Sequence, residues 1–264
     1  MKIQHVASWS EFLALVDSPA LHGWAFRGQL NASWPIVSSL TRYLERFVDP
    51  QRWASQENRA FRVFKRKAHY FLSDPSALQD GFRCLALMQH HGAPTRLIDL
   101  TKSPYVAAYF ALETATSDSA VFALNTPALW LDAKPKGRED LSREAIDPRV
   151  GDNLETYFFS NRYPVVWPGE PWMMDRRIVA QAGTFVLPGI AGQSIEALLA
   201  QYDHKDDLLI KIVLPPSIRT EAMQALYRMN ITSATLFPDL DGLARSIAYE
   251  LEVNWLGTSG PPLP

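Results

Sequence analysis

The sequence predicts an α+β fold, arranged as a single domain with an N-terminal helical part. Three observations indicate this. The 264 residues are enough to bury one sizeable core. The hydrophobic content of 47% is that of an ordinary globular protein. No internal repeat, linker or low-complexity tract divides the chain. We therefore expect one domain over residues 1–264, with a helical insertion at about 42–92 and an irregular excursion at about 126–175.

The predicted helices are marked by capping residues and by apolar side chains at helical spacing. Ser8 fits a cap with Glu11 three residues later, and Ser103 fits a cap followed by Pro104 at the first helical position. Gly92 is typical of the residue that follows a helix. The helices are expected at residues 8–16, 51–72, 82–91, 105–114, 194–202, 216–229 and 239–251.

Short apolar runs predict the strands. They are expected at residues 23–29, 93–101, 119–124, 177–187 and 208–214. Within the run 177–187, strand alternation would place Val179, Gln181 and Gly183 on one face, with a turn or bulge at Gly183. Residues 126–175 contain six prolines, which predicts a long surface excursion.

Composition and missing motifs exclude several classes of protein. A single cysteine, Cys84, excludes an intramolecular disulfide and a zinc site built on several cysteines, and no metal site is expected. The glycine-rich phosphate loops GxGxxG and GxxxxGK do not occur. The first residues lack a signal-peptide core, and no run reaches about 18 apolar residues. We therefore expect a cytoplasmic protein without a membrane partner.

Charge is balanced over the chain but not within it. Lys and Arg number 26 against 28 Asp and Glu, a net charge of −2, which does not suggest nucleic-acid binding by the whole chain. Residues 42–67, however, hold a surplus of five positive charges. This stretch could bind nucleic acid, although a solvated helix face is the commoner explanation. Its basic side chains are Arg42, Arg46, Arg52, Arg59, Arg62, Lys65, Arg66 and Lys67.

Arg27 is the first residue with potential chemistry. It follows Phe26 and precedes Gly28 at the end of a predicted strand. Its guanidinium could bind a phosphate or carboxylate with two parallel hydrogen bonds, while the glycine lets a ligand approach the backbone. The alternative is an arginine paired with a structural carboxylate.

The segment 89–104 concentrates reactive side chains around a helix end, a turn and a new helix start. Adjacent histidines cannot face the same way on a helix, so His90 and His91 make a poor metal site, although each could act as acid or base. Ser103 could be simply a helix cap, and Asp99 could form a salt bridge with Arg96 or Arg27. The reactive set is His90, His91, Thr95, Arg96, Asp99, Thr101 and Ser103.

Two further places carry polar groups in apolar surroundings. Gln181, in the middle of a predicted strand, must find partners or face a site. Asp239 and Asp241 are metal or base candidates, although Asp239 fits a helix cap and Asp241 fits the first helical turn.

The motifs WAFRGQ, ALMQHHGAPTRLIDLTKSPYVAAYFA, RRIVAQAGTF and LFPDLDGLA occur in this order from about residue 20 to residue 250. In them the chain resembles the FRG domain family, named for a motif that is Phe26-Arg27-Gly28 here. It is also distantly similar to ADP-ribosyltransferases of the arginine–serine–glutamate type. Phe26-Arg27-Gly28 resembles their first strand, residues 100–103 with Ala107 and Phe110 resemble the second element, and residues 177–187 resemble the third.

The second resemblance implies a mixed or antiparallel β core and NAD as a substrate, with transfer of ADP-ribose to an unknown macromolecular acceptor. The chain would then be an effector, such as a toxin or a phage-defence component. Cleaving the nicotinamide bond creates an oxocarbenium-like centre. The implied catalytic residues are Arg27, His91, Asp99 and Gln181. The implied NAD-binding residues are Arg27, Gly28, Gln29, His90, Thr95, Arg96, Thr101 and Ser103.

The chain departs from the transferases in the third element, where Gln181 stands in place of a glutamate. A neutral amide cannot act as a general base or stabilise a cationic centre as a carboxylate does. Glu170 or Asp175 could substitute. The alternative hypothesis is a non-catalytic module that binds a nucleotide or nucleic acid, or a nuclease.

Overall fold

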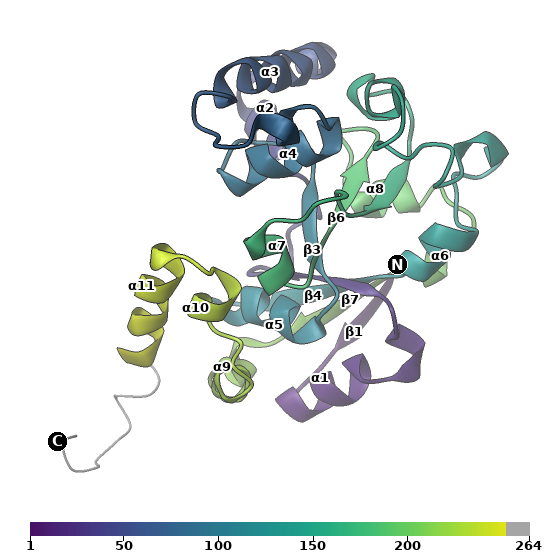
Figure 1. Cartoon of the computed structure of the whole chain (residues 1–264). Helices are drawn as coiled ribbons and strands as arrows, with labels where there is room; N and C mark the ends of the chain where they lie inside the picture. The colour runs from purple at the N-terminus through teal and green to yellow at the C-terminus, as the bar shows by residue number, and fades with distance from the viewer. Residues whose placement is uncertain (252–264) are drawn as a thin grey trace.

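A computed structural model describes residues 1–251 of the chain, which form a mixed seven-stranded sheet with helices around it (Figure 1). The strand order is β1-β7-β4-β2-β3-β6-β5. Strands β1 and β7 pair in parallel, and the other five neighbouring pairs are antiparallel. The predicted α+β class is therefore confirmed. The strands are β1 (Lys2–His5), β2 (Ala25–Gln29), β3 (Ile98–Thr101), β4 (Ser119–Leu124), β5 (Val166–Gly169), β6 (Gly183–Pro188) and β7 (Leu209–Leu214).

Several helices begin where the capping residues predict. The Ser8 hydroxyl accepts a hydrogen bond from the Glu11 amide at 3.2 Å, and Asp239 accepts one from the Gly242 amide at 2.8 Å. The helices are α1 (Trp9–Val16), α2 (Ser39–Phe47), α3 (Trp53–Ala68), α4 (Gly81–His90), α5 (Pro104–Leu112), α6 (Thr126–Leu131), α7 (Arg176–Ala180), α8 (Ile195–Leu199), α9 (Arg219–Arg228), α10 (Ser233–Leu236) and α11 (Leu240–Tyr249).

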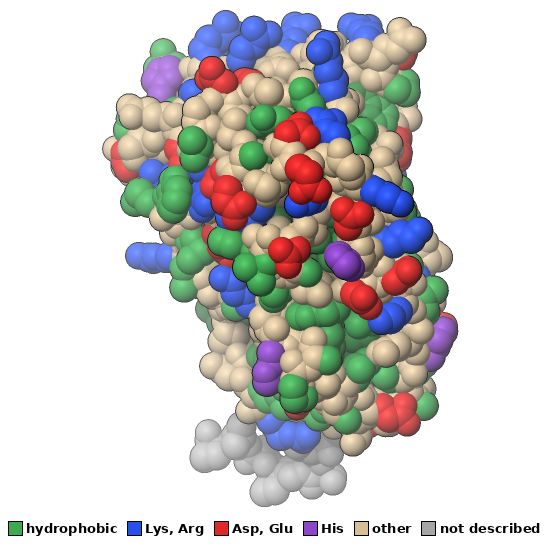
Figure 2. All heavy atoms as spheres, turned by 90° about the vertical axis from the view of Figure 1, so that its right-hand side faces the viewer, with side chains coloured by type: hydrophobic (Ala, Val, Ile, Leu, Met, Phe, Trp, Pro, Cys, Tyr) green, Lys and Arg blue, Asp and Glu red, His purple; other side chains and the backbone are tan. Residues whose placement is uncertain are grey.

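Helices cover both faces of the sheet. Buried side chains of α1, α5 and α9 pack on one face, against Phe26 and Val121. Those of α6 and α8 pack on the other, against Ala25 and Phe122. Helices α2, α3 and α4 gather at one end (Figure 1), where α3 and α4 pack against Phe185 of β6. Basic side chains line the top of the molecule in Figure 2, where Figure 1 places α3.

Two elements near the N-terminal side were not predicted. Strand β1 has an exposed–intermediate burial pattern, so it lacks the apolar run by which the other strands are recognised. Helix α2 begins after Ser38, whose hydroxyl accepts a hydrogen bond from the Thr41 amide at 3.1 Å. It has few apolar residues, and three of its nine side chains are buried.

The prediction of a strand over residues 177–187 is wrong for its first half. Asp175 caps helix α7, accepting a hydrogen bond from the Ile178 amide at 2.9 Å. Gln181 ends that helix, and the chain turns at Ala182, which has a φ of 45°. Strand β6 therefore begins at Gly183, and Gln181 has no position in a strand face. The local cap overrides the apolar pattern.

Residues 126–175 are only in part the surface excursion that the prolines predict. They contain helix α6, a π-helical turn at Leu154–Phe159 and the edge strand β5. Trp167 and Phe158 from this stretch are fully buried. Pro168 is tolerated in β5 because that strand pairs with β6 alone and lies at the edge of the sheet.

Helix α5 lies directly on β2 at Gly28. A Cβ atom added to Gly28 would stand 2.0 Å from the carbonyl oxygen of Ala107 and 2.6 Å from the amide nitrogen of Ala111. Both atoms belong to the helix backbone and cannot move aside alone. The missing side chain makes room for the backbone of the helix.

We predict that Gly28→Ala destabilises the protein by about 3 kcal/mol or more, because overpacking against a backbone is costly. Chemical denaturation measures this change. Gly151→Ala is the matched control, since its Cβ would meet open space and only its φ of 53° disfavours a side chain. That control should cost about 1–2 kcal/mol. Equal losses in the two variants would contradict the packing argument.

Candidate functional site

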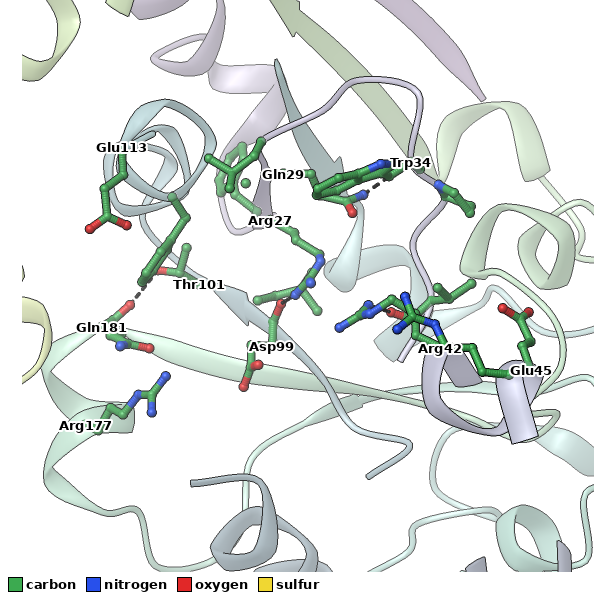
Figure 3. Close-up of a pocket in the computed structure, with 18 residues that line it drawn as sticks. Arg27, Gln29, Trp34, Arg42, Glu45, Asp99, Thr101, Glu113, Arg177 and Gln181 are labelled. Carbon is green, nitrogen blue, oxygen red and sulfur yellow. Dashed lines mark hydrogen bonds between the residues drawn. The ribbon is translucent and has the colours of Figure 1, made fainter. Parts of the chain in front are cut away.

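Strands β2 and β3 separate soon after they meet. They form one rung, Phe26 with Thr101, whereas β2 pairs with β4 over its whole length. If the ladder continued, Asp99 would lie opposite Gly28. Instead Nη1 of Arg27 donates a hydrogen bond of 2.7 Å to the main-chain oxygen of Asp99 (Figure 3). A side chain therefore replaces a lost rung of the sheet, and the separating strands open a cleft.

The cleft has a volume of about 780 Å³. It lies between β2 and β3, and helices α2, α5 and α7 contribute to its walls. Its lining combines charged, amide and aromatic side chains. The charged and polar lining residues are Arg27, Gln29, Arg42, Glu45, Arg46, Asp99, Thr101, Glu113, Arg177 and Gln181.

Arg27 and Arg42 approach the cleft from different elements, β2 and α2 (Figure 3). Burial lowers the pKa of the Arg27 guanidinium, the nearby charge of Asp99 raises it, and the positive charge of Arg42 lowers it further. Arg42 donates through Nη1 to the carbonyl of Val37 at 2.8 Å. Within residues 1–251 neither arginine forms an ion pair with a carboxylate at contact distance, and the buried Nε of Arg27 has no hydrogen-bond partner. The site thus has positive charge to offer an anion.

The carboxylates of the cleft differ in how they are held. Glu113 accepts a hydrogen bond of 3.0 Å from the Tyr109 hydroxyl. Asp99 is exposed, and among the described residues its carboxylate has no hydrogen bond or ion pair. The bond that Arg27 makes to Asp99 goes to the main-chain oxygen, so the side chain of Asp99 does not form the salt bridge with Arg27 that the sequence allowed.

Gln181 reaches the cleft, but much of its hydrogen-bonding capacity is already used. Its side-chain Nε2 donates to the carbonyl of Leu236 at 3.1 Å. Its main-chain oxygen accepts from the Thr101 hydroxyl at 2.6 Å. A glutamate here would lose the donor to Leu236 and set a carboxylate against a carbonyl. The amide therefore ties α7 to α10, and Thr101 ties β3 to α7.

Aromatic side chains complete the lining. Trp34 is 50% exposed although it is a large apolar residue, and it stands beside Gln29 (Figure 3). Gln29 donates to the main-chain oxygen of Trp34 at 3.4 Å. Phe110 lines the opposite side, on α5. An exposed aromatic face beside positive charge suits the stacking of a planar base.

Several predicted site residues lie outside this cleft. The hydroxyl of Ser103 accepts a hydrogen bond from the Val106 amide at 3.3 Å and caps α5. His91 is exposed at the end of α4, and His90 Nδ1 lies 3.1 Å from Asp175 Oδ2. The proposed substitutes for a glutamate are also placed elsewhere. Lys102 pairs with Glu170 at 2.8 Å, and Asp175 caps α7. Asp239 caps α11, with Asp241 exposed in its first turn.

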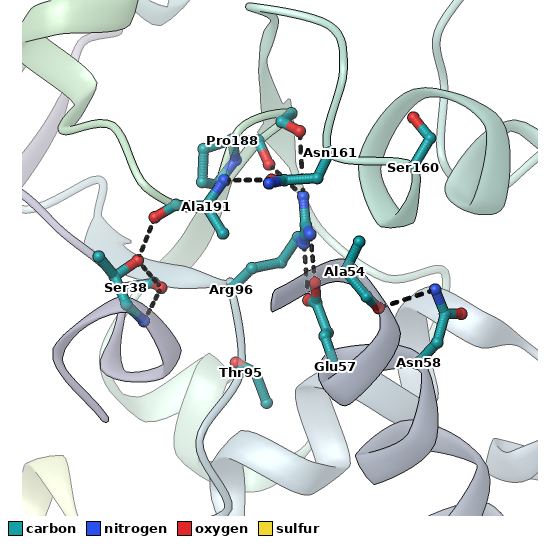
Figure 4. A network of polar contacts seen from close by, with 12 residues as sticks. Ser38, Ala54, Glu57, Asn58, Thr95, Arg96, Ser160, Asn161, Pro188 and Ala191 are labelled. Atoms are coloured by element: carbon teal, nitrogen blue, oxygen red, sulfur yellow. Dashed lines mark hydrogen bonds and ion pairs between the residues drawn. The ribbon is translucent and has the colours of Figure 1, made fainter. Parts of the chain in front are cut away.

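Arg96 and Thr95 have structural partners in place of a ligand (Figure 4). Arg96 is fully buried, and its guanidinium donates through Nε to Glu57 of α3 at 2.6 Å and through Nη2 to the other oxygen of the same carboxylate. Its Nη1 donates to the carbonyl of Pro188 at 3.0 Å. The hydroxyl of Thr95, which is also buried, donates to the side chain of Gln89. This network joins α3 to the chain after β6.

Four residues line the cleft that were not predicted as site residues: Trp34, Glu45, Glu113 and Arg177. Arg42 and Arg46 were counted only as part of a basic stretch. A signal existed for three of the six: Arg42 and Arg46 are in that stretch, and Arg177 is in the RRIVAQAGTF motif. No local pattern marks Trp34 or Glu113, because they reach the cleft only through the fold.

Residues 1–251 contain neither a metal-binding cluster nor a membrane-spanning helix. No group of three or more His, Cys, Asp or Glu side chains is arranged to hold a metal ion. None of the helices in this part of the chain has the length and apolar character needed to cross a bilayer.

We predict that Glu57→Gln lowers the free energy of unfolding by about 3–5 kcal/mol, because it leaves the buried charge of Arg96 without a counter-charge. Thermal and urea denaturation test this. Asp140→Asn is the control, since it removes an exposed carboxylate that also pairs with an arginine, Arg138, and should leave the melting temperature nearly unchanged. Similar losses in both variants would refute a special role for the buried pair.

Of the two resemblances, comparison with known proteins supports the one to the FRG domain family. No curated protein and no solved structure is significantly similar to the chain. The family model of the FRG domain matches residues 22–120. The matched segment contains β2, the basic helices α2 and α3, β3 and α5, and so both strands that open the cleft. It does not include α7 or the LFPDLDGLA motif. Over residues 22–120 the chain is therefore similar to the FRG domain family.

Proposed function

We propose that the cleft binds a nucleotide that carries a diphosphate group. The observation that supports this most directly is the approach of Arg27 and Arg42 to one cavity without a carboxylate paired to either. Two like charges in a partly desolvated site repel each other, and an anion between them relieves that repulsion. Guanidinium groups bind phosphate oxygens with pairs of parallel hydrogen bonds.

The rest of the lining fits the remainder of a nucleotide. Trp34 offers an exposed ring on which a base can stack, and Arg46 adds positive charge at the same wall. Gln29 on β2 and Thr101 on β3 add an amide and a hydroxyl group to the lining of the cleft. We assign the diphosphate to Arg27 and Arg42, and the base to Trp34.

We further propose NAD as the nucleotide, with cleavage of its nicotinamide bond. The specific observation in favour is Asp99, whose unbonded carboxylate lies in the cleft beside Arg27. In this reaction the bond from the ribose carbon to the nicotinamide nitrogen breaks, and its electron pair leaves with nicotinamide. An acceptor hydroxyl or water forms the new bond to that carbon and loses a proton. The carboxylate of Asp99 would stabilise the positive centre and assist that proton transfer.

In this proposal Asp99 takes the role that a glutamate of the third element has in the transferases. Gln181 then has a positioning role. Consumption of NAD would deplete the cofactor in a host cell, as a toxin or a phage-defence effector does. The alternative is a cleft that binds the nucleotide without chemistry. The two are separated by the measurements below, because binding and cleavage are assigned to different residues.

We predict that Arg27→Lys weakens the binding of ADP-ribose at least tenfold, because lysine cannot present two parallel donors. Isothermal titration calorimetry measures this. Arg228→Lys, an exposed residue of α9 outside the cleft, is the matched control and should bind as the wild type does. Melting temperatures verify folding. Unchanged affinity in a folded Arg27→Lys variant would remove Arg27 from the site.

We predict that Asp99→Asn retains ADP-ribose binding but lowers nicotinamide release from NAD by at least tenfold. The substitution preserves shape and removes the negative charge, and the exposed side chain has no bond to lose within residues 1–251. Chromatographic assay of nicotinamide tests this. If the wild type binds ADP-ribose and releases no nicotinamide, the cleavage proposal fails and the binding module stands.

A further inference from the structure

The α3 helix has a row of arginines that no part of the described structure uses. Arg59, Arg62 and Arg66 are spaced three and four residues apart, which places them on one side of a helix. The opposite side holds buried Glu57, Phe61 and Ala68. The three arginines are exposed, and among residues 1–251 they form no ion pair or hydrogen bond. We call this row the arginine stripe.

The local charge around the stripe is more positive than the sequence alone indicates. Of the three acidic residues in 42–67, Glu57 is buried and neutralised by Arg96. The exposed surface of this stretch therefore carries only two carboxylates, Glu45 and Asp49, against eight basic residues. In a chain with a net charge of −2, such a surplus is confined to one end of the molecule, as Figure 2 shows along its top.

Exposed aromatic rings precede and follow the stripe in the chain. Tyr70 and Phe71, just after α3, are 82% and 87% exposed. Tyr43 and Phe47, on α2, are 56% and 69% exposed, and their ring centroids lie 5.1 Å apart with the two planes tilted by 47°. Large aromatic side chains at such exposure lose hydrophobic stabilisation unless a partner covers them.

We infer that the arginine stripe and its flanking aromatics form a binding site for single-stranded nucleic acid. Positive groups along a line neutralise consecutive phosphates, and aromatic rings stack on unpaired bases. At about 1.5 Å of rise per residue, Arg59 and Arg66 are about 10 Å apart along the helix axis, a span of two or three phosphates. The inference goes beyond the proposed function, since the stripe lies outside the cleft and does not need a nucleotide in it.

The stripe continues toward the cleft through α2. Arg42 and Arg46 belong to the same basic stretch and also line the cavity with Arg27. A strand lying on α3 would therefore extend past Tyr43 and Phe47 toward the cleft. This continuity distinguishes a nucleic acid from an anionic bilayer, which is flat and would contact the stripe without following α2 into a concave site.

The test uses the full chain and fluorescence anisotropy with labelled 12-nucleotide single strands of DNA and of RNA, over a range of salt concentrations. The triple variant Arg59→Gln, Arg62→Gln and Arg66→Gln should bind at least tenfold more weakly. The slope of log affinity against log salt should fall by about 2, at roughly 0.7 per lost contact. Tyr70→Ala with Phe71→Ala should weaken binding and leave the slope unchanged.

The matched control removes three exposed positive charges from other surfaces, Lys136→Gln, Arg162→Gln and Arg228→Gln. It should bind as the wild type does. Equal weakening in the control would show a general charge effect and overturn the proposal. Absence of oligonucleotide binding, or binding only to vesicles rich in anionic lipid, would overturn it too.

Discussion

Helix α5 can lie on strand β2 because Gly28 has no side chain, and much of the structure depends on this contact. The backbone of Ala107 occupies the space where a Cβ would be. Its neighbour Arg27 must then point to the opposite face, toward Asp99. The start of α5 is held by Ser103, whose amide donates to Thr101 at the end of β3. One glycine thus sets the helix, the direction of the arginine and the point where the two strands meet.

The cleft forms because strands β2 and β3 separate and because helices α2 and α3 are held in position. Strands β2 and β3 share one rung, and Arg27 bridges the gap beyond it. The buried pair of Arg96 and Glu57 fixes α3, and the Thr41 hydroxyl, which donates to the carbonyl of Ala191 at 2.5 Å, fixes α2. Helix α2, which carries Arg42, is therefore held in place at the cleft that Arg27 also lines. Two of the residues expected at the ligand have structural partners: Arg96 belongs to this support, and Ser103 caps α5.

Capping residues predicted the helices whose first turn is held by a side-chain hydrogen bond close in sequence. Ser8, Ser103 and Asp239 cap the helices they were expected to cap. Gln181 was misplaced because the cap at Asp175 outweighs an apolar run that also suits a strand. Of the four residues that the transferase resemblance implies as catalytic, Arg27, Asp99 and Gln181 line one cleft, and His91 does not. Trp34 and Glu113 could not be predicted, since only long-range pairing brings them to the cleft, and the bond from Arg27 to a main-chain oxygen leaves no mark in the sequence.

The central claim is that Arg27 and Arg42 together bind the diphosphate of a nucleotide. A crystal structure of the chain with ADP-ribose tests it most directly. The account predicts diphosphate oxygens within about 3 Å of both guanidinium groups, with the adenine against Trp34. A diphosphate bound elsewhere, with Arg27 still bonded only to Asp99 and the cleft filled by solvent, would contradict it.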